Sequence, residues 1–305
     1  MISIAILITV FNRADKTLAC LDSVGNAVRS GVVPFSLRVF LTDDGSSDGT
    51  ADRIRERNYP FPIEILTGDG TLFWNGGMIN SWKAAIAFPE DFDGYLWLNN
   101  DTVILPSFWK MLDETDSFAR ARYGKGQIYV GSTRDKQNGK FTYGGFNFIN
   151  KLTLKDRMLP PNGEIQECEC AHGNITFVSK EVVEKTGIFT DKYKHGGSDH
   201  DYTYRAYRKG FHNMVLPDFA GECENDHPKD GNRPNFFAMP LKKRIEYLKS
   251  PNGLNLHNTL LFQKRCFPWR YPIILATGYF KAMFPKLYHR LYLRARGVKP
   301  SGWGN

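Results

Sequence analysis

The chain has 305 residues, 42% of them hydrophobic, and a formal net charge of +8. This length fits one large α/β domain with an appendage, and the composition can fill a sizeable core; with no internal repeat or low-complexity segment, repeat and low-complexity architectures are excluded. Five cysteines, an odd number without a disulfide-framework pattern, indicate a reducing compartment.

The first ten residues are apolar, but they lack the basic start and the small-residue cleavage site of a signal peptide. We therefore predict that residues 3–11 form a core strand and that the protein stays in the cytoplasm. A helix over residues 15–29 and a second strand over residues 37–42 follow.

The second predicted strand runs into the acidic, glycine-bearing sequence Asp43-Asp44-Gly45-Ser46-Ser47-Asp48-Gly49-Thr50. A strand, a helix and a strand with a polar exit are typical of the nucleotide-binding half of an α/β fold. The alternative is a turn in which one of the two leading aspartates only caps a helix.

A glycine-rich stretch, residues 68–77, lies between a third strand and a predicted helix over residues 78–88. Glycine lets a backbone approach a ligand closely, and a helix start can face phosphate.

Residues 95–101 read as a buried strand that ends in Asn99, Asn100 and Asp101. The carboxyl end of a strand in a parallel sheet is where α/β folds place ligands, and a carboxylate there suits a hard divalent cation that carries phosphates. Alone, the same residues would be read as a turn with a helix cap.

These segments resemble the family-2 glycosyltransferases with the GT-A fold. The resemblance rests on four motifs in the right order over roughly the first 230 residues, where one short motif alone would carry a high false-positive risk. They are Thr9-Val10-Phe11-Asn12-Arg13, the acidic sequence at 43–50, Leu98-Asn99-Asn100-Asp101, and Gly197-Ser198-Asp199-His200-Asp201 followed by Arg205 and Lys209-Gly210.

The resemblance implies an α/β GT-A fold, a Rossmann-like mixed sheet flanked by helices with a C-terminal helical extension. We predict a catalytic domain over residues 1–240, with a nucleotide-binding half at 1–101 and an acceptor-binding half at 102–240, and an extension at 241–305. The implied activity is inverting transfer of a hexose or deoxyhexose from a nucleoside-diphosphate sugar to a glycan or lipid-linked hydroxyl. The pattern is similar to bacterial rhamnosyltransferase-like enzymes of cell-surface polysaccharide synthesis.

The resemblance also implies a role for each motif residue. Asp44 would accept the ring N–H of uracil or thymine, which indicates a UDP- or dTDP-sugar. Asp199 would be the general base, and Mg²⁺ or Mn²⁺ would bind at Asp101 and His227. Trp74 and Asn75 would contact the donor sugar, for which dTDP-rhamnose is a candidate. The other expected nucleotide contacts are Thr9, Phe11, Arg13, Gly76, Asn99 and Asn100.

Two positions depart from the family pattern. Asn99 and Ser198 stand where many relatives carry acids, which leaves open a non-catalytic sugar-nucleotide or glycan binder. A nucleotidyltransferase is the remaining alternative. It is disfavoured because its glycine-rich phosphate loop would follow the first strand, where this chain has Val10-Phe11-Asn12-Arg13.

The C-terminal segment carries the basic charge. Residues 241–305 contain thirteen Lys or Arg and one acid, hence +12, whereas residues 1–240 sum to −4. Its longest apolar run, residues 271–280, is too short to span a bilayer, and Pro285 should break or kink the chain beyond it. Aromatic and basic residues together predict a peripheral position on the cytoplasmic face of a membrane. Packing on the catalytic domain or an oligomer interface is the alternative, and nucleic acid is disfavoured as a partner.

Overall fold

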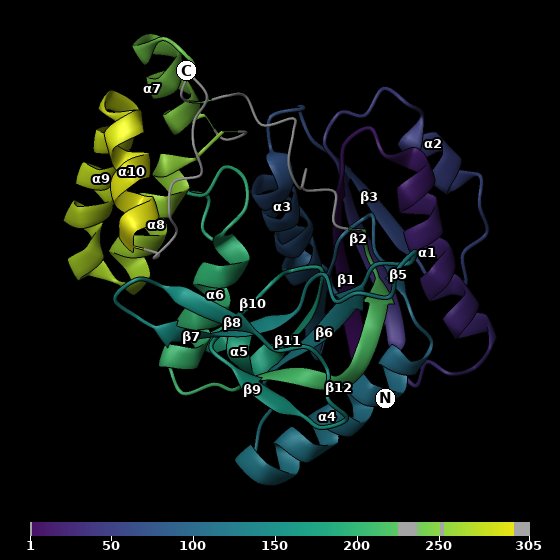
Figure 1. The fold of residues 1–305 in the computed structure, drawn as a ribbon. Coiled ribbons are helices and arrows are strands. Elements are labelled where there is room, and N and C mark those ends of the chain that lie inside the picture. Colours follow the sequence, from purple (N-terminus) through teal and green to yellow (C-terminus); the bar gives the residue numbers. More distant parts are fainter. Residues whose placement is uncertain (1, 225–235, 237, 251–252, 296–305) are drawn as a thin grey trace. The chain divides into compact units, whose positions relative to one another are not determined.

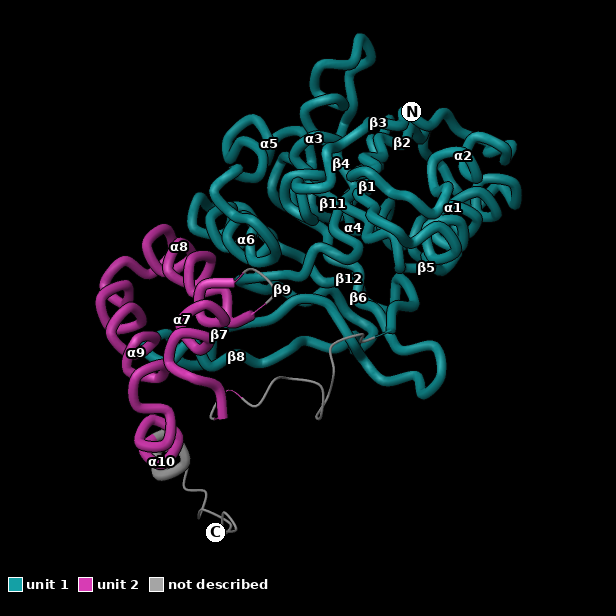
Figure 2. The backbone as a smooth tube through the Cα atoms, turned by 90° about the horizontal axis from the view of Figure 1, so that it is seen from above, with its two compact units in different colours: residues 1–225 teal, residues 226–305 magenta. Residues whose placement is uncertain are grey.

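The computed structural model describes residues 2–224, 236, 238–250 and 253–295, with side chains as far as residue 291. The chain divides into two compact units, residues 1–225 and 226–305 (Figure 2). The sequence places this boundary at residue 240, and most residues between the two positions lie outside the described ranges.

Within the described residues, the first unit is built on a nine-stranded mixed sheet (Figure 1). Its path is β3-β2-β1-β4-β11-β6-β12-β5, and β9 pairs with β12. The first four strands of that path are parallel to one another, and β11 is antiparallel to both neighbours. The strands are β1 (Ser3–Val10), β2 (Ser36–Asp43), β3 (Ile63–Thr67), β4 (Gly94–Leu98), β5 (Val103–Ile104), β6 (Ile128–Arg134), β9 (Gln166–Cys168), β11 (Ile175–Ser179) and β12 (Asn213–Glu222).

Helices cover both faces of this sheet, and the central strand β1 is therefore apolar on both sides. Ile4, Ile6 and Ile8 pack with α1, α2 and α4 on one face, while Ala5 and Leu7 pack with α3, α5 and α6 on the other. The helices are α1 (Ala14–Arg29), α2 (Thr50–Arg55), α3 (Phe73–Ala87), α4 (Ser107–Tyr123), α5 (Lys180–Thr186) and α6 (Ser198–Arg208). The mixed sheet flanked by helices confirms the predicted fold class.

The predicted strands and the first helix agree with the structure to within one or two residues at most boundaries. The helix predicted over residues 78–88 is wrong at its start, because α3 begins at Phe73. Gly76 and Gly77 therefore lie in a helix and not in a loop. Gly77 is required by packing: a Cβ at this position would lie 1.9 Å from Thr9 Oγ1 and 2.7 Å from Thr9 Cβ on β1.

A second, three-stranded sheet has the order β10-β7-β8, with strands at Cys170–Ala171, Gly145–Asn150 and Lys155–Met158. It packs through β10 against α6, and the Ala171 N–H donates to Thr203 Oγ1 at 3.1 Å. This small sheet places His172 and Gly173, which follow β10, beside the start of α6.

The C-terminal unit is helical where it is described. It contains α7 (Leu241–Lys249), α8 (Leu256–Cys266), a 3₁₀ turn (Pro268–Arg270), α9 (Tyr271–Met283) and α10 (Pro285–Ala295). Phe236, Leu248, Leu256 and Ala282 form its core. The predicted break at Pro285 is present, since α9 ends at Met283 and α10 begins at the proline.

Candidate active site

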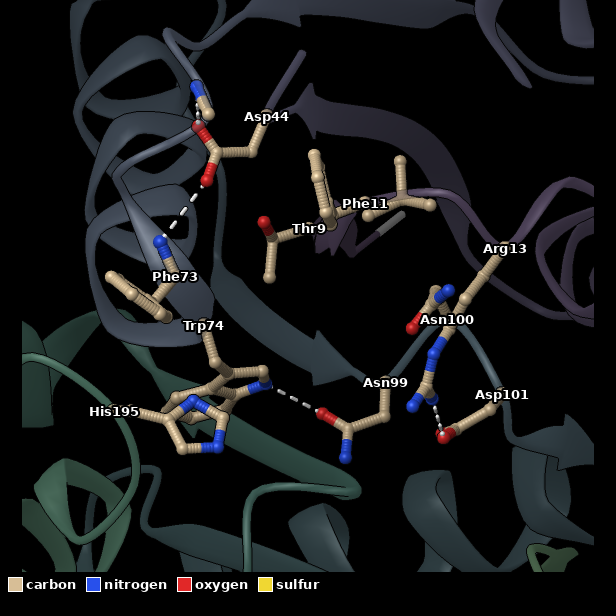
Figure 3. Close-up of a pocket in the computed structure, with 12 residues that line it drawn as sticks. Thr9, Phe11, Arg13, Asp44, Phe73, Trp74, Asn99, Asn100, Asp101 and His195 are labelled. Atoms are coloured by element: carbon tan, nitrogen blue, oxygen red, sulfur yellow. Dashed lines mark hydrogen bonds and ion pairs between the residues drawn. The ribbon is translucent and has the colours of Figure 1, made fainter. Parts of the chain in front are cut away.

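Three predicted motifs meet at one edge of the sheet because β1 lies between β2 and β4. The parallel register pairs Val10 with Asp43 and Leu7 with Trp97, so the residues that follow these strands emerge side by side. They line a cleft of about 340 Å³, with Thr9 and Phe11 between Asp44 and Asp101 (Figure 3). The lining residues are Thr9, Val10, Phe11, Arg13, Asp44, Gly70, Phe73, Trp74, Asn99, Asn100, Asp101 and His195.

Asp44 is buried at one end of the cleft and holds the loop that follows β3. Its Oδ1 accepts the Gly70 N–H at 2.9 Å, and its Oδ2 accepts the Phe73 N–H at 3.1 Å. Phe73 has a φ of +53°, a left-handed conformation that costs a non-glycine residue about 1–2 kcal/mol. The carboxylate offsets this strain, and each of its oxygens keeps a second lone pair for a ligand.

Asp43 and Asp48 accept hydrogen bonds from the backbone of the loops around the cleft. Asp43 Oδ1 accepts the Ser46 N–H, and Asp48 Oδ2 accepts the Ala14 N–H at the start of α1. The Thr50 hydroxyl donates to Asp48 and lowers the pKa of that carboxyl. Asn12 joins the same network through Ser47 N and the Ser46 hydroxyl. The segment that carries Phe11, a side chain 53% exposed at the cleft, is thus fixed between two motifs.

Asp101 lies at the opposite end of the cleft and is paired with a cation of the chain itself. Arg13 Nη1 lies 2.7 Å from Asp101 Oδ2, and the side chains are 45% and 18% exposed. The Cys223 thiol lies 3.8 Å from the other carboxylate oxygen. Beneath them, burial and the Asp101 charge raise the pKa of Cys20, which keeps this thiol protonated.

The donor set at this end fits a divalent metal that arrives with phosphates. Among the described residues no group of three or more His, Cys, Asp or Glu side chains could hold a metal alone. Mg²⁺ is commonly held by one or two carboxylates together with substrate phosphates, which is what Asp101 can offer. His227, the second predicted ligand, lies outside the described residues.

Trp74 forms the wall of the cleft opposite Arg13, and its indole is held on two sides. Nε1 donates to Asn99 Oδ1 at 2.8 Å (Figure 3). A Cβ on Gly173 would lie 3.0 Å from the indole and 3.4 Å from Asp199 Cβ, so a larger residue here would push the indole aside. Asp199, the predicted base, therefore lies next to Gly173, the residue whose backbone packs against the Trp74 indole.

Asp199 sits in the first turn of α6. Its Oδ2 accepts the Gly173 N–H at 3.0 Å, and its Oδ1 accepts the His200 N–H at 2.9 Å. Both carboxylate oxygens thus accept backbone N–H groups at the start of the helix. The side chain remains 14% exposed, and His200 Nε2 lies 3.9 Å from Oδ2.

The polar residues around Asp199 form hydrogen bonds and ion pairs with other partners. Asp201 is buried and pairs with Arg205 at 2.8 Å one turn along α6. His172 donates through Nδ1 to the Gly144 carbonyl at 2.9 Å, because a carbonyl oxygen can only accept. Burial lowers the pKa of His172 to about 4, so its ring is neutral near pH 7. Its ring packs edge-on against His200 at 4.9 Å between centroids.

Some residues line the cleft that the sequence did not predict there, and some predicted residues do not line it. Phe73 and His195 line the cleft with their rings 6.1 Å apart, and neither was singled out from the sequence. Asn75 is fully buried and donates to the carbonyls of Thr190 and Tyr193, so it positions the chain segment that ends at His195. Gly76 follows it in α3 and is not among the lining residues.

No family model and no curated protein sequence matches this chain. Solved structures do match in three dimensions. A mannosyltransferase from Pyrobaculum calidifontis, in complex with GDP-Man and Mn²⁺, has a TM-score of 0.52 at 13% identity over 96% of this chain and 79% of that one. S. aureus TarS 1–349 in complex with UDP has a TM-score of 0.58 at 10% identity over 98% and 93% of the two chains.

A third similar structure is GalNAc-T7 with UDP, GalNAc and Mn²⁺, with a TM-score of 0.54 at 12% identity over 80% of this chain and 47% of that one. The chain has the GT-A fold. At these identities the likeness establishes the fold alone, so the chemistry of the cleft has to be argued from its residues.

Proposed function

We propose that the protein is an inverting, metal-dependent glycosyltransferase that uses a UDP- or dTDP-sugar. Its acceptor would be a hydroxyl of a glycan or lipid-linked intermediate of cell-surface polysaccharide synthesis. The observation that carries the proposal is the order of groups along the cleft. Asp44 lies at one end and Asp101 at the other, and Asp199, which is not among the lining residues, lies next to the Trp74 wall because both side chains lie close to Gly173.

The two ends of the cleft suit the two ends of a nucleotide sugar. A carboxylate is an acceptor, so Asp44 favours a base with a ring N–H, and the exposed Phe11 ring offers a stacking surface. Arg13 and Asp101 provide positive charge and a metal ligand for the diphosphate. The indole of Trp74 supports a sugar with an apolar face, such as rhamnose.

The reaction then needs one proton acceptor on the face of the sugar opposite the diphosphate. The acceptor hydroxyl attacks the anomeric carbon, its proton passes to Asp199, and the bond from that carbon to the diphosphate oxygen breaks. A divalent metal, when bound at Asp101, would stabilise the charge of the leaving nucleoside diphosphate. Arg13 is placed to contribute to the same stabilisation.

Donor binding should be tested first, with nucleotide sugars screened for a raised thermal midpoint in Mg²⁺ or Mn²⁺. Asp101→Ala should abolish the metal-dependent part of the shift. Release of nucleoside diphosphate on addition of acceptor then separates an enzyme from a binder. Donor binding without any release over a panel of acceptors would favour the non-catalytic alternative.

The base is tested by Asp199→Asn, with the exposed Asp191→Asn as its control. Asp199→Asn should keep donor binding and slow transfer by roughly 10² to 10⁴, the usual contribution of a general base. Asp191→Asn should transfer at the normal rate. Near-normal turnover by Asp199→Asn in a single-turnover experiment would remove Asp199 from the mechanism.

A further inference from the structure

The C-terminal unit carries a row of large apolar side chains that its own core does not cover. Five of them are 46% to 53% exposed, and they lie on α9, on α10 and at the residue between them. We call this set the α9–α10 stripe: Ile273, Met283, Phe284, Leu287 and Leu291.

On α9 the stripe occupies one face of the helix, because the opposite face packs against the core of the C-terminal unit. Gly278 lets α9 approach α8 so closely that a Cβ would lie 2.9 Å from Leu256 Cδ1, and Ala282 is fully buried in the same contact region. Ile274 packs on this core, whereas its neighbour Ile273 is exposed. The helix therefore has a packed side and an apolar side with no core against it.

The stripe continues from α9 into α10 despite the proline. The Phe284 N–H donates to the Phe280 carbonyl at 2.8 Å, and the Phe284 carbonyl accepts the Tyr288 N–H at 2.9 Å. Phe284 thus closes the last turn of α9 and opens the first turn of α10, although its own φ of −123° and ψ of 58° are not helical. Leu287 and Leu291 are four residues apart on α10 and therefore lie on one face of that helix.

The charge around the stripe has a single sign. Between residues 241 and 291 there are ten Lys or Arg and one acid, Glu246, which lies on α7. Lys286 and Arg290 are exposed on α10, the helix that carries Leu287 and Leu291. Two copies of so basic a unit would repel each other, which disfavours a dimer formed through this face.

We infer that the α9–α10 stripe binds the surface of an anionic lipid bilayer, with both helices in the plane of the interface. Among the described residues, no helix is long and apolar enough to cross a membrane. An apolar face flanked by cations, with the exposed Trp269 in the 3₁₀ turn before α9, is what an interfacial helix requires. The inference builds on the proposed function by naming where a lipid-linked acceptor is met, but lipid binding needs no sugar transfer.

Sedimentation of the full chain with vesicles tests the inference directly. Vesicles of phosphatidylcholine with one quarter phosphatidylglycerol should pellet the protein at low salt and release it at high salt, and pure phosphatidylcholine should bind it far less. Lys286→Gln with Arg290→Gln should lower the partition coefficient by about 25-fold, since each cation near an anionic surface contributes about fivefold. Equal binding to both kinds of vesicle, or none to either, would overturn the inference.

The apolar part is tested by Phe284→Ser with Leu287→Ser. A matched control is Ile86→Ser, which replaces a side chain of 50% exposure on α3 in the first unit. The stripe variant should lose binding about 100-fold and the control should bind like the wild type, provided the thermal midpoint with donor is unchanged in each. If the stripe variant keeps its vesicle binding, or instead turns an oligomer into a monomer in gel filtration, the stripe is not a membrane surface. Failure of transfer in solution would count against the proposed function alone.

Discussion

The indole N–H of Trp74 donates to Oδ1 of Asn99 at 2.8 Å, and this contact fixes which way the Asn99 amide points. An indole nitrogen can only donate, so the amide oxygen must face Trp74 and the amide nitrogen must face away from it. Asn99 therefore offers its N–H groups to the cleft. Many relatives carry an acid at this position. In this chain Asn99 would instead donate a hydrogen bond to the nucleotide or the sugar.

Asn99→Asp should convert that donor into a second carboxylate beside Asp101. One oxygen would still accept from Trp74, and the other would face the cleft. The free protein should then bind Mn²⁺ about tenfold more tightly, because an added charged ligand strengthens a hard-metal site. Electron paramagnetic resonance of Mn²⁺ without nucleotide measures this, with the surface substitution Asn138→Asp as control. Unchanged affinity would show that the metal does not bind near residue 99.

Trp74→Phe should weaken donor binding by freeing the Asn99 amide. The substitution keeps an aromatic wall but deletes the N–H, and a neutral hydrogen bond of this kind contributes about 0.5–1.5 kcal/mol. We expect KM for the donor to rise by roughly two- to tenfold with little change in kcat. In a double-mutant cycle with Asn99→Ala the two effects should not add. Full additivity would mean that the contact does not orient the amide.

Asp44→Asn should loosen the loop after β3 and flatten the preference for the base at the same time. The amide that replaces one oxygen would face the N–H of Gly70 or of Phe73, which leaves a buried donor unsatisfied at a cost of about 1–3 kcal/mol. Competition binding should show that UDP loses its advantage over CDP in this variant. The exposed Asp69→Asn on the same loop is the control. Tight selection of GDP by the wild type would contradict the pyrimidine proposal, since guanine also has a ring N–H.

Residues that line the cleft can be read from the sequence where they follow directly on a buried strand. Apolar runs that end in Asp44 or in Asn99 to Asp101 can be read without a structure, because strand burial and polar exits are local features. His195 could not be found in this way, since it reaches the cleft from a loop held by Asn75. The start of α3 was missed because two glycines resemble a loop, whereas the second of them serves a contact with β1 that only the tertiary structure reveals.

Gly77→Ala should therefore destabilise the fold, although alanine favours helix. A Cβ only 1.9 Å from Thr9 Oγ1 and 2.7 Å from Thr9 Cβ cannot be relieved by rotation of the hydroxyl, and overpacking of this kind costs about 1–3 kcal/mol. Gly76→Ala is the matched control, because its Cβ would meet only the Leu72 side chain at 3.1 Å while gaining up to about 1 kcal/mol of helix propensity. Chemical denaturation of both variants measures the difference. A Gly77→Ala variant as stable as Gly76→Ala would show that α3 can move away from β1.

His172 should make the stability of the first unit depend on pH. Burial, together with His200, lowers the pKa of His172 from 6.5 to about 4 against the opposing effect of Asp199 and Asp156. As the pH falls through 6.5 the unfolded chain takes up a proton that the folded chain does not accept until about pH 4. The contribution of His172 to the free energy of unfolding is therefore fully present above pH 6.5. It declines by up to about 3 kcal/mol as the pH approaches 4.

His172→Asn removes the titrating ring but keeps an N–H for the Gly144 carbonyl, so it should abolish most of this slope. Denaturant unfolding of the two proteins at pH 6.5 and at pH 4.5 measures it. Glu167 and Glu181, whose pKa values are lowered, affect both proteins alike over this interval, so the difference between the two proteins reports His172. The wild type should lose clearly more stability over this interval than His172→Asn does. The exposed His257→Asn should behave like the wild type, because this substitution leaves the buried His172 ring in place. Parallel slopes for wild type and His172→Asn would mean that water reaches His172 and that the wall behind Asp199 is open.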